Sequence, residues 1–207
     1  MPKQVRVLRQ MARVLSLDPV IFTESWFRSF EERCIGYYPS LEDNLFTICR
    51  SQGVITEHAL VRKAAQKKYD YTLHQMRPES EIINVLEQLM QRKYKIGLIS
   101  NCSSEIPFVW NQTELAPYFD QTIFSCIEGI KKPDMQIFLT MASRLGFKPD
   151  QCLYVGDGDD DELTGASKAG MNTMLVNKSD TSDSSYDDNT IDYQIGSVMQ
   201  LMEILKE

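Results

Sequence analysis

The sequence predicts an α/β protein, with a Rossmann-like parallel sheet preceded by an N-terminal bundle of helices. Residues 1–76 carry only helical signals, whereas after residue 77 short apolar runs alternate with helical segments of about ten residues. Continuous apolar strands separated by helices are typical of βαβ units, in which helices cover both faces of a parallel sheet. We therefore expect a helical domain over 1–76 and an α/β core over 77–207.

Capping residues divide the helical block. Residues 1–17 place apolar side chains at helical spacing with basic ones between them, which predicts an amphipathic helix. The same basic, acid-free pattern also occurs in mitochondrial transit peptides. Three further helices are expected, opened by Asp18-Pro19, Pro39-Ser40 and Thr56-Glu57. The first of these should run unbroken to Cys34, and the third should carry its basic residues, Lys68 among them, on its outer face.

The core segments alternate in type along the chain. Strands are expected over 96–100, 122–126, 152–155 and 173–176. Helices are expected over 79–93, 103–111, 134–145, 161–169 and 198–205. The segment 179–189 is rich in Ser and Asp, which predicts a solvated loop.

Composition excludes several classes of protein. The 207 residues contain 43% hydrophobic and 25% charged residues and have a net charge of −7. An acidic balance argues against a nucleic-acid partner, and no apolar run approaches the ~20 residues that cross a bilayer. The five cysteines are widely spaced and form no CxxC pair, so neither a disulfide framework nor a zinc site is expected. This cysteine usage favours a reducing, cytoplasmic location.

Chemistry-bearing residues follow three of the predicted strands. These segments are Ser100-Asn101-Cys102-Ser103, Gly129 to Asp134, and Gly156 to Glu162. In open parallel sheets, ligands bind outside the carboxyl ends of the strands, so the three segments should meet at one edge. A hydroxyl, an amide, a lysine and an acidic cluster at one edge could hold a phosphate beside a divalent cation.

Each residue type suits a role in that site. Ser100, Asn101 and the free N–H groups of the following helix could bind phosphate oxygens, and Lys132 could neutralise the negative charge. Asp157 with Glu162 or Asp161 could hold Mg²⁺, which binds few carboxylates and keeps several waters.

Each segment taken alone also has an alternative interpretation. A Ser-Asn pair after a strand is commonly a helix cap, and Lys-Pro-Asp is commonly a turn that enters a helix. A calcium loop would use Asp157, Asp159 and Asp161, but its sixth position would be Glu162 instead of Gly and its twelfth Lys168 instead of Glu. The three segments in this order are more specific than any one of them.

Together these segments resemble three of the four motifs of the haloacid dehalogenase (HAD) superfamily. The second motif corresponds to Ile96 to Ser100 with Asn101, and the third to Lys132-Pro133-Asp134. The fourth corresponds to Leu153 to Asp157, continued by Gly165-Ala166. Counting back three residues from Gly165 selects Glu162 as the second acid, with Asp161 as the other candidate.

The resemblance implies a hydrolase with a helical cap over residues 1–76. It implies a Mg²⁺-dependent phosphatase that acts on a small phosphorylated metabolite, with Lys132 and Ser100 as catalytic residues. Ser100, Asn101 and Lys132 would bind phosphate, and Asp157 and Glu162 would bind the metal. A 2-haloacid dehalogenase has the same fold and is the alternative, although the retained acids favour phosphoryl chemistry.

The first motif of the family is absent from this sequence. In the family, this motif is a strand that runs into Asp-x-Asp-x-Thr and supplies the nucleophile. The most similar residue in this sequence is Asp18, but Val20 stands at the position of the second acid. We therefore expect the first core strand, central in the family's sheet, to be missing together with the nucleophile. A fragment, a misassigned start or a decayed copy would explain this, and so would a catalytically silent phosphate- and metal-binding protein. The chain alone is expected to be inactive and poorly stable.

Overall fold

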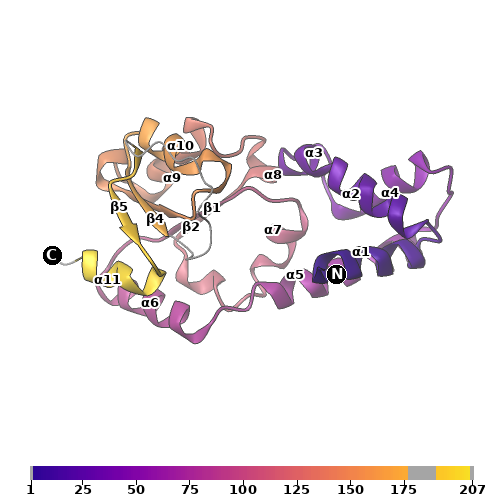
Figure 1. The fold of residues 1–207 in the computed structure, drawn as a ribbon, viewed down its shortest axis with the longest axis horizontal. Helices are drawn as coiled ribbons and strands as arrows, with labels where there is room; N and C mark the ends of the chain where they lie inside the picture. The colour runs from indigo at the N-terminus through magenta and orange to yellow at the C-terminus, as the bar shows by residue number, and fades with distance from the viewer. Residues whose placement is uncertain (1, 177–189, 206–207) are drawn as a thin grey trace. The chain divides into compact units, whose positions relative to one another are not determined.

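The computed structural model describes residues 2–176 and 190–205, so the loop predicted over 179–189 lies outside the described residues. The chain forms two compact units, and Figure 1 traces it from indigo to yellow. The first unit comprises Met1–Arg77, Asn101–Ala116 and Phe124–Gly129, and the second comprises Pro78–Ser100, Pro117–Ile123 and Ile130–Glu207. The predicted α/β class is confirmed.

The first unit is built of helices. They are α1 (Lys3–Val14), α2 (Pro19–Arg28), α3 (Phe30–Cys34), α4 (Leu41–Ser51), α5 (His58–Gln75), α7 (Glu105–Trp110) and α8 (Ser125–Glu128). As predicted, α1 is amphipathic and buries Leu8, Met11 and Ala12 in the core of this unit. Asp18 caps α2, because its Oδ1 accepts hydrogen bonds from the N–H groups of Val20 and Ile21 at 2.8 and 3.0 Å.

The prediction of one unbroken helix from Pro19 to Cys34 was wrong, because the helix breaks at Ser29. The Ser29 hydroxyl donates to the Trp26 carbonyl at 3.1 Å, and Arg33 Nη2 donates to the same carbonyl at 2.8 Å. Side-chain donors therefore bind a carbonyl oxygen of the last turn of α2, where a serine hydroxyl competes with the helical backbone pattern. The chain restarts as α3 one residue later.

The second unit contains two sheets flanked by helices. Its strands are β1 (Gly97–Ser100), β2 (Gln121–Phe124, whose last residue belongs to the first unit), β3 (Leu153–Gly156), β4 (Asn172–Val176) and β5 (Tyr193–Ile195). Its α-helices are α6 (Ser80–Gln91), α9 (Met135–Leu145), α10 (Glu162–Lys168) and α11 (Leu201–Ile204). β1 pairs with β2, and β3, β4 and β5 form a second, parallel sheet in that order.

Two strand predictions need correction. β5 was not predicted, because it is only three residues long and buries one apolar side chain, Ile195, which is too little for an apolar run. The strand predicted over 122–126 ends at Phe124, because Ser125 and Cys126 begin the short helix α8. The buried Ser125 hydroxyl bonds the Cys102 N–H and carbonyl at 2.9 and 3.3 Å and so ties this helix to the loop after β1.

Helices cover both faces of the strands in the second unit. On one face, α9 and α10 pack Ile137, Phe138 and Ala166 against Ile99 and Ile123. On the other face, a separate cluster of apolar residues joins α6, α11, β3, β4 and β5. Figure 1 shows β4 and β5 side by side, with α6 and α11 next to each other along one face. This layering is the one predicted for a parallel sheet.

Among the described strands, the two sheets are not joined, because β1 of the first sheet does not pair with β3 of the second. Helix α9 contacts both strands, because Met141 packs on Gly97 and the Phe138 ring meets the Tyr154 ring edge-on at 5.0 Å. β1 and β3 are nevertheless not paired with each other, and no other strand of the described residues pairs with both. Both strands are half-exposed along most of their length, whereas the middle of β4 is buried. Each therefore presents an edge whose backbone N–H and C=O groups suit pairing with a further strand.

Candidate active site

Lys132, Tyr154 and Glu162 bond to one another in the second unit. Lys132 Nζ forms an ion pair with Glu162 Oε2, and the same nitrogen donates to the Tyr154 hydroxyl at 3.2 Å. The Tyr154 hydroxyl donates to Glu162 Oε2 at 2.6 Å. The Lys132 and Glu162 side chains are 13% and 4% exposed, so this pair is largely shielded from water. A shielded, charge-assisted contact of this kind is stronger than an exposed ion pair.

Two glycines make room for this contact. A Cβ atom on Gly156 would lie 1.9 Å from Glu162 Oε1, and a Cβ atom on Gly165 would lie 2.4 Å from the Pro133 carbonyl oxygen. Gly165 thus allows α10 to approach the segment that follows Lys132, and Gly156 leaves space for the carboxylate. The glycines of the sequence motif therefore bring Glu162, the first residue of α10, to Lys132.

The structure brings Glu162, and not Asp161, to the lysine. Asp161 is exposed at the N-terminus of α10, whereas Glu162 is 3% exposed. Both Glu162 oxygens accept hydrogen bonds, because Oε1 takes the Gly158 N–H at 3.2 Å while Oε2 takes Lys132 and Tyr154.

The acidic segment after β3 offers carboxylate oxygens of the kind that a divalent cation binds. Asp157 is exposed directly after β3, and its Oδ1 accepts the Asp159 N–H at 3.4 Å. Asp157 is therefore suited to bind a hard cation through its carboxylate oxygen. Glu162 is instead engaged as the ion-pair partner of Lys132. Within residues 2–176 and 190–205 no group of three or more potential metal ligands occurs.

Ser100 and Asn101 take the positions expected from the sequence. Ser100 is the last residue of β1, half-buried and in the second unit. Asn101 begins the segment that belongs to the first unit, and that segment leads into α7. The Lys132–Pro133 peptide bond is cis, and α9 starts at Met135 with Asp134 as its cap.

The sequence analysis did not single out Tyr154, because it lies within an apolar strand. Alternation along β3 could have found it, since residues two apart share a face. Tyr154 and Gly156 are such a pair, and Glu162 contacts the face that they share. Burial, followed by the nearby Glu162 carboxylate, raises the pKa of the Tyr154 hydroxyl, so it remains a donor at neutral pH.

The first unit contains a buried cluster of charges that the sequence did not reveal. Lys68, predicted on the outer face of its helix, is 7% exposed and pairs with buried Glu105 at 3.1 Å. Arg33 is 4% exposed, donates to Ser103 Oγ at 3.1 Å and stacks on the Trp26 ring at 3.9 Å. The prediction for Lys68 failed because a lysine beside other lysines resembles a solvated face, whereas Glu105 is distant in sequence.

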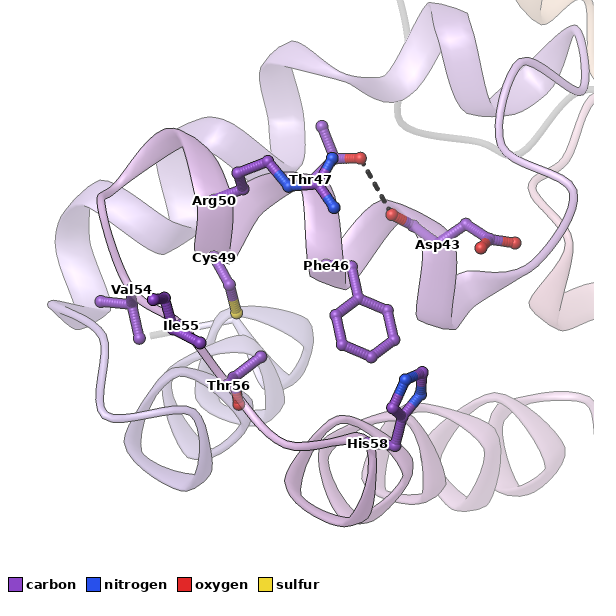
Figure 2. Close-up of a pocket in the computed structure, with 9 residues that line it drawn as sticks. All are labelled: Asp43, Phe46, Thr47, Cys49, Arg50, Val54, Ile55, Thr56 and His58. Atoms are coloured by element: carbon purple, nitrogen blue, oxygen red, sulfur yellow. Dashed lines mark hydrogen bonds between the residues drawn. The ribbon is translucent and has the colours of Figure 1, made fainter.

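A pocket of about 460 Å³ lies in the first unit, and none of the predicted site residues lines it. Figure 2 shows it between α4, the segment 54–56 and the start of α5. Phe46 and His58 meet edge-on across it at 4.6 Å, and Thr47 bonds the Asp43 carbonyl at 3.0 Å.

Comparison with known proteins identifies the family to which this chain belongs. The profile of haloacid dehalogenase-like hydrolases matches residues 20–170, and the chain belongs to this family of enzymes. The family predicted from the motifs is thereby confirmed.

Among curated relatives, two archaeal phosphatases and a dehalogenase are informative. The glyceraldehyde 3-phosphate phosphatase of Methanopyrus kandleri is 26% identical over 92% of this chain and 83% of its own length. The phosphatase of the same name from Methanocaldococcus jannaschii is 31% identical over 63% of this chain and 58% of its own length. The (S)-2-haloacid dehalogenase of Pseudomonas fluorescens is 27% identical over 74% of this chain and 66% of its own length.

Solved structures share the fold. The 2-haloacid dehalogenase of Pseudomonas syringae is 22% identical and superimposes with a TM-score of 0.70, over 97% of this chain and 89% of that one. A HAD family enzyme of Bacteroides thetaiotaomicron, solved with magnesium and inorganic phosphate, is 17% identical with a TM-score of 0.57 over 78% and 82%. None of the helices in the described residues is long and apolar enough to cross a membrane.

Proposed function

We propose that this chain carries the phosphate-binding part of a phosphatase that acts on a small phosphorylated metabolite. The observation that carries this proposal is the shielded Lys132–Glu162 pair beside Asp157 at the end of β3. A lysine beside a phosphoryl group would offset its negative charge, which favours phosphoryl transfer. The name of the Methanopyrus kandleri relative supports a small phosphorylated substrate.

The roles follow from the chemistry of each group. Lys132 would stabilise negative charge on the phosphoryl oxygens as a point charge, and Ser100 of the same unit would bind those oxygens by a hydrogen bond. The phosphate-binding role of Asn101 stays a prediction from the sequence, because Asn101 belongs to the other unit. Ser100 and Lys132 are thus the proposed catalytic residues among those described.

Magnesium would be held by Asp157 as a direct ligand, with Glu162 as a second acid that acts indirectly. When bound, the ion would neutralise charge on the phosphate group. The contacts of Glu162 support an indirect part in metal binding, because both of its oxygens already accept hydrogen bonds. Asp157 would then be the acid on which the metal affinity depends most.

Among the described residues, no carboxylate is proposed as the attacking group. Asp18 acts as a helix cap, since its Oδ1 accepts two backbone N–H groups at the start of α2. The unpaired edges of β1 and β3 support a site for a strand that carries the nucleophile. Determining the reading frame upstream of Met1 tests this. An in-frame Asp-x-Asp-x-Thr after an apolar run supports the phosphatase, and its absence supports a catalytically silent phosphate-binding protein.

Dehalogenase chemistry is the second candidate, favoured by the names of the Pseudomonas relatives. The acids Asp157 and Glu162 favour the phosphatase, because attack on carbon needs no metal.

The five cysteines, none of them in a disulfide, favour a reducing cytoplasm.

Phosphate binding should depend on Lys132 and not on Lys131. We expect Lys132→Ala to weaken inorganic phosphate binding about tenfold or more, since a charge-assisted contact of this kind is lost. Lys131→Ala is the matched control and should change it less than about twofold. Isothermal titration of the 207-residue chain with phosphate measures both. A larger loss with Lys131→Ala would mean that the register of the motif is wrong.

Magnesium binding should be weak and should depend on Asp157. Asp157→Asn should lower the Mg²⁺ affinity more than Asp159→Asn or Asp160→Asn, because only Asp157 directly follows β3. Thermal-shift titration with MgCl₂ is the measurement. Equal effects of the three substitutions would indicate a diffuse electrostatic patch instead of a site.

A further inference from the structure

The hydroxyl of Tyr154 is the group that this inference concerns. It accepts from Lys132 Nζ at 3.2 Å and donates to Glu162 Oε2 at 2.6 Å, so it bonds both members of the ion pair. The three polar groups therefore form a closed triangle within the second unit. The backbone N–H of Gly158 supports the triangle from the other oxygen of Glu162, at 3.2 Å.

The hydroxyl is more than a packing feature. The Tyr154 ring meets Phe138 edge-on at 5.0 Å, a contact that a phenylalanine would make equally well. Placing a hydroxyl at this half-buried position is unfavourable unless it is bonded. Within residues 2–176 and 190–205, the hydroxyl forms its hydrogen bonds with Lys132 and Glu162.

Lysine gains direction from a second acceptor. Its four-carbon stem is flexible and its ammonium group has three equivalent donors, so one carboxylate partner leaves the orientation of Nζ variable. Two acceptors at fixed positions, one of them on the rigid ring of a strand residue, define where Nζ lies. Positioning to within a fraction of an ångström matters for phosphoryl transfer, where catalysis depends largely on geometry and charge.

We propose that Tyr154 is a positioning residue, which holds the Lys132 ammonium in place by bonding both the lysine and its partner Glu162. The proposal rests on the proposed function, because it assigns Lys132 to a phosphate ligand. Tyr154 acts through Lys132 and is not itself expected to contact phosphate.

The first test is Tyr154→Phe, which removes the hydroxyl and keeps the ring. Tyr193→Phe is the matched control, because the Tyr193 side chain is exposed. We expect the Lys132 acetylation rate, measured by mass spectrometry against exposed Lys148, to rise several-fold in Tyr154→Phe. Phosphate affinity should fall about fivefold, while Tyr193→Phe leaves both unchanged. An unchanged Lys132 rate in a folded Tyr154→Phe protein would overturn the proposal.

A double-mutant cycle separates positioning from a structural role. In a Lys132→Met background, Tyr154→Phe should cause no further loss of phosphate affinity, because the hydroxyl acts only through the lysine. Additive losses would overturn the proposal. Tyr154→Met keeps the apolar volume and replaces Tyr154→Phe if the latter fails to fold. A wild-type chain that binds no phosphate would contradict the proposed function instead, and the acetylation rates would still decide the role of Tyr154.

Discussion

A strand supplied between β1 and β3 should convert the chain into an active phosphatase and stabilise it at the same time. We expect this result from prepending about 20 residues of apolar strand that end in Asp-x-Asp-x-Thr. The strand would pair the open edges of β1 and β3, and its first aspartate would provide the attacking carboxylate. Activity should rise from undetectable to measurable on an aryl phosphate, and the melting temperature should rise by several degrees.

The control for this experiment is the same segment with both aspartates changed to asparagine. It should raise the melting temperature equally and produce no activity, because pairing depends on the backbone and attack depends on the carboxylate. Thermal denaturation measures the change in stability, and the release of nitrophenolate from nitrophenyl phosphate, as the aryl phosphate, measures the activity. An added segment that leaves stability unchanged would contradict the interpretation of β1 and β3 as open edges.

Glu105→Gln should destabilise the first unit by about 3 kcal/mol, because it leaves buried Lys68 and Arg33 without a negative partner. The matched control is Lys95→Met, which breaks an exposed ion pair with Asp120 and should cost less than about 1 kcal/mol. Urea denaturation measures the free energy of unfolding of each variant. Equal losses would mean that the buried cluster contributes no more than a surface pair.

The same cluster predicts a pH dependence. Burial alone would raise the pKa of Glu105, but Lys68, Ser103 and Arg33 outweigh it and hold the pKa below its ordinary value of 4.5. A carboxyl whose pKa is lowered on folding stabilises the protein above its unfolded pKa, and this contribution is lost as the pH falls through the folded pKa. The wild-type chain should therefore lose stability below about pH 4.5 more steeply than Glu105→Gln, by denaturation at a series of pH values.

The sequence predicted the parts of this molecule that depend on local pattern. Apolar runs located β1, β3 and β4. The choice of Glu162 over Asp161 came from the resemblance to the family's fourth motif, and the structure brings Glu162 to Lys132. The apolar pattern could not identify Tyr154, because its hydroxyl bonds Lys132 and Glu162, which lie outside its strand.

Contacts between distant segments could not be predicted in the same way. The pairing of Lys68 with Glu105 joins α5 to α7, and nothing near either residue marks it as buried. The three residues of β5 form too short a pattern to distinguish a strand from a loop in the sequence. They are a strand because they pair with β4. These features depend on tertiary packing, which overrides local propensity.

The central proposal is that the described residues of this HAD-family chain bind phosphate and do not supply the attacking carboxylate. Hydrolysis of an aryl phosphate by this chain, with and without Mg²⁺, tests it most directly. We predict no hydrolysis above background in either condition, although inorganic phosphate still binds. Mg²⁺-dependent hydrolysis by a well-folded monomer, abolished by Asp18→Asn, would contradict the account and make Asp18 the nucleophile.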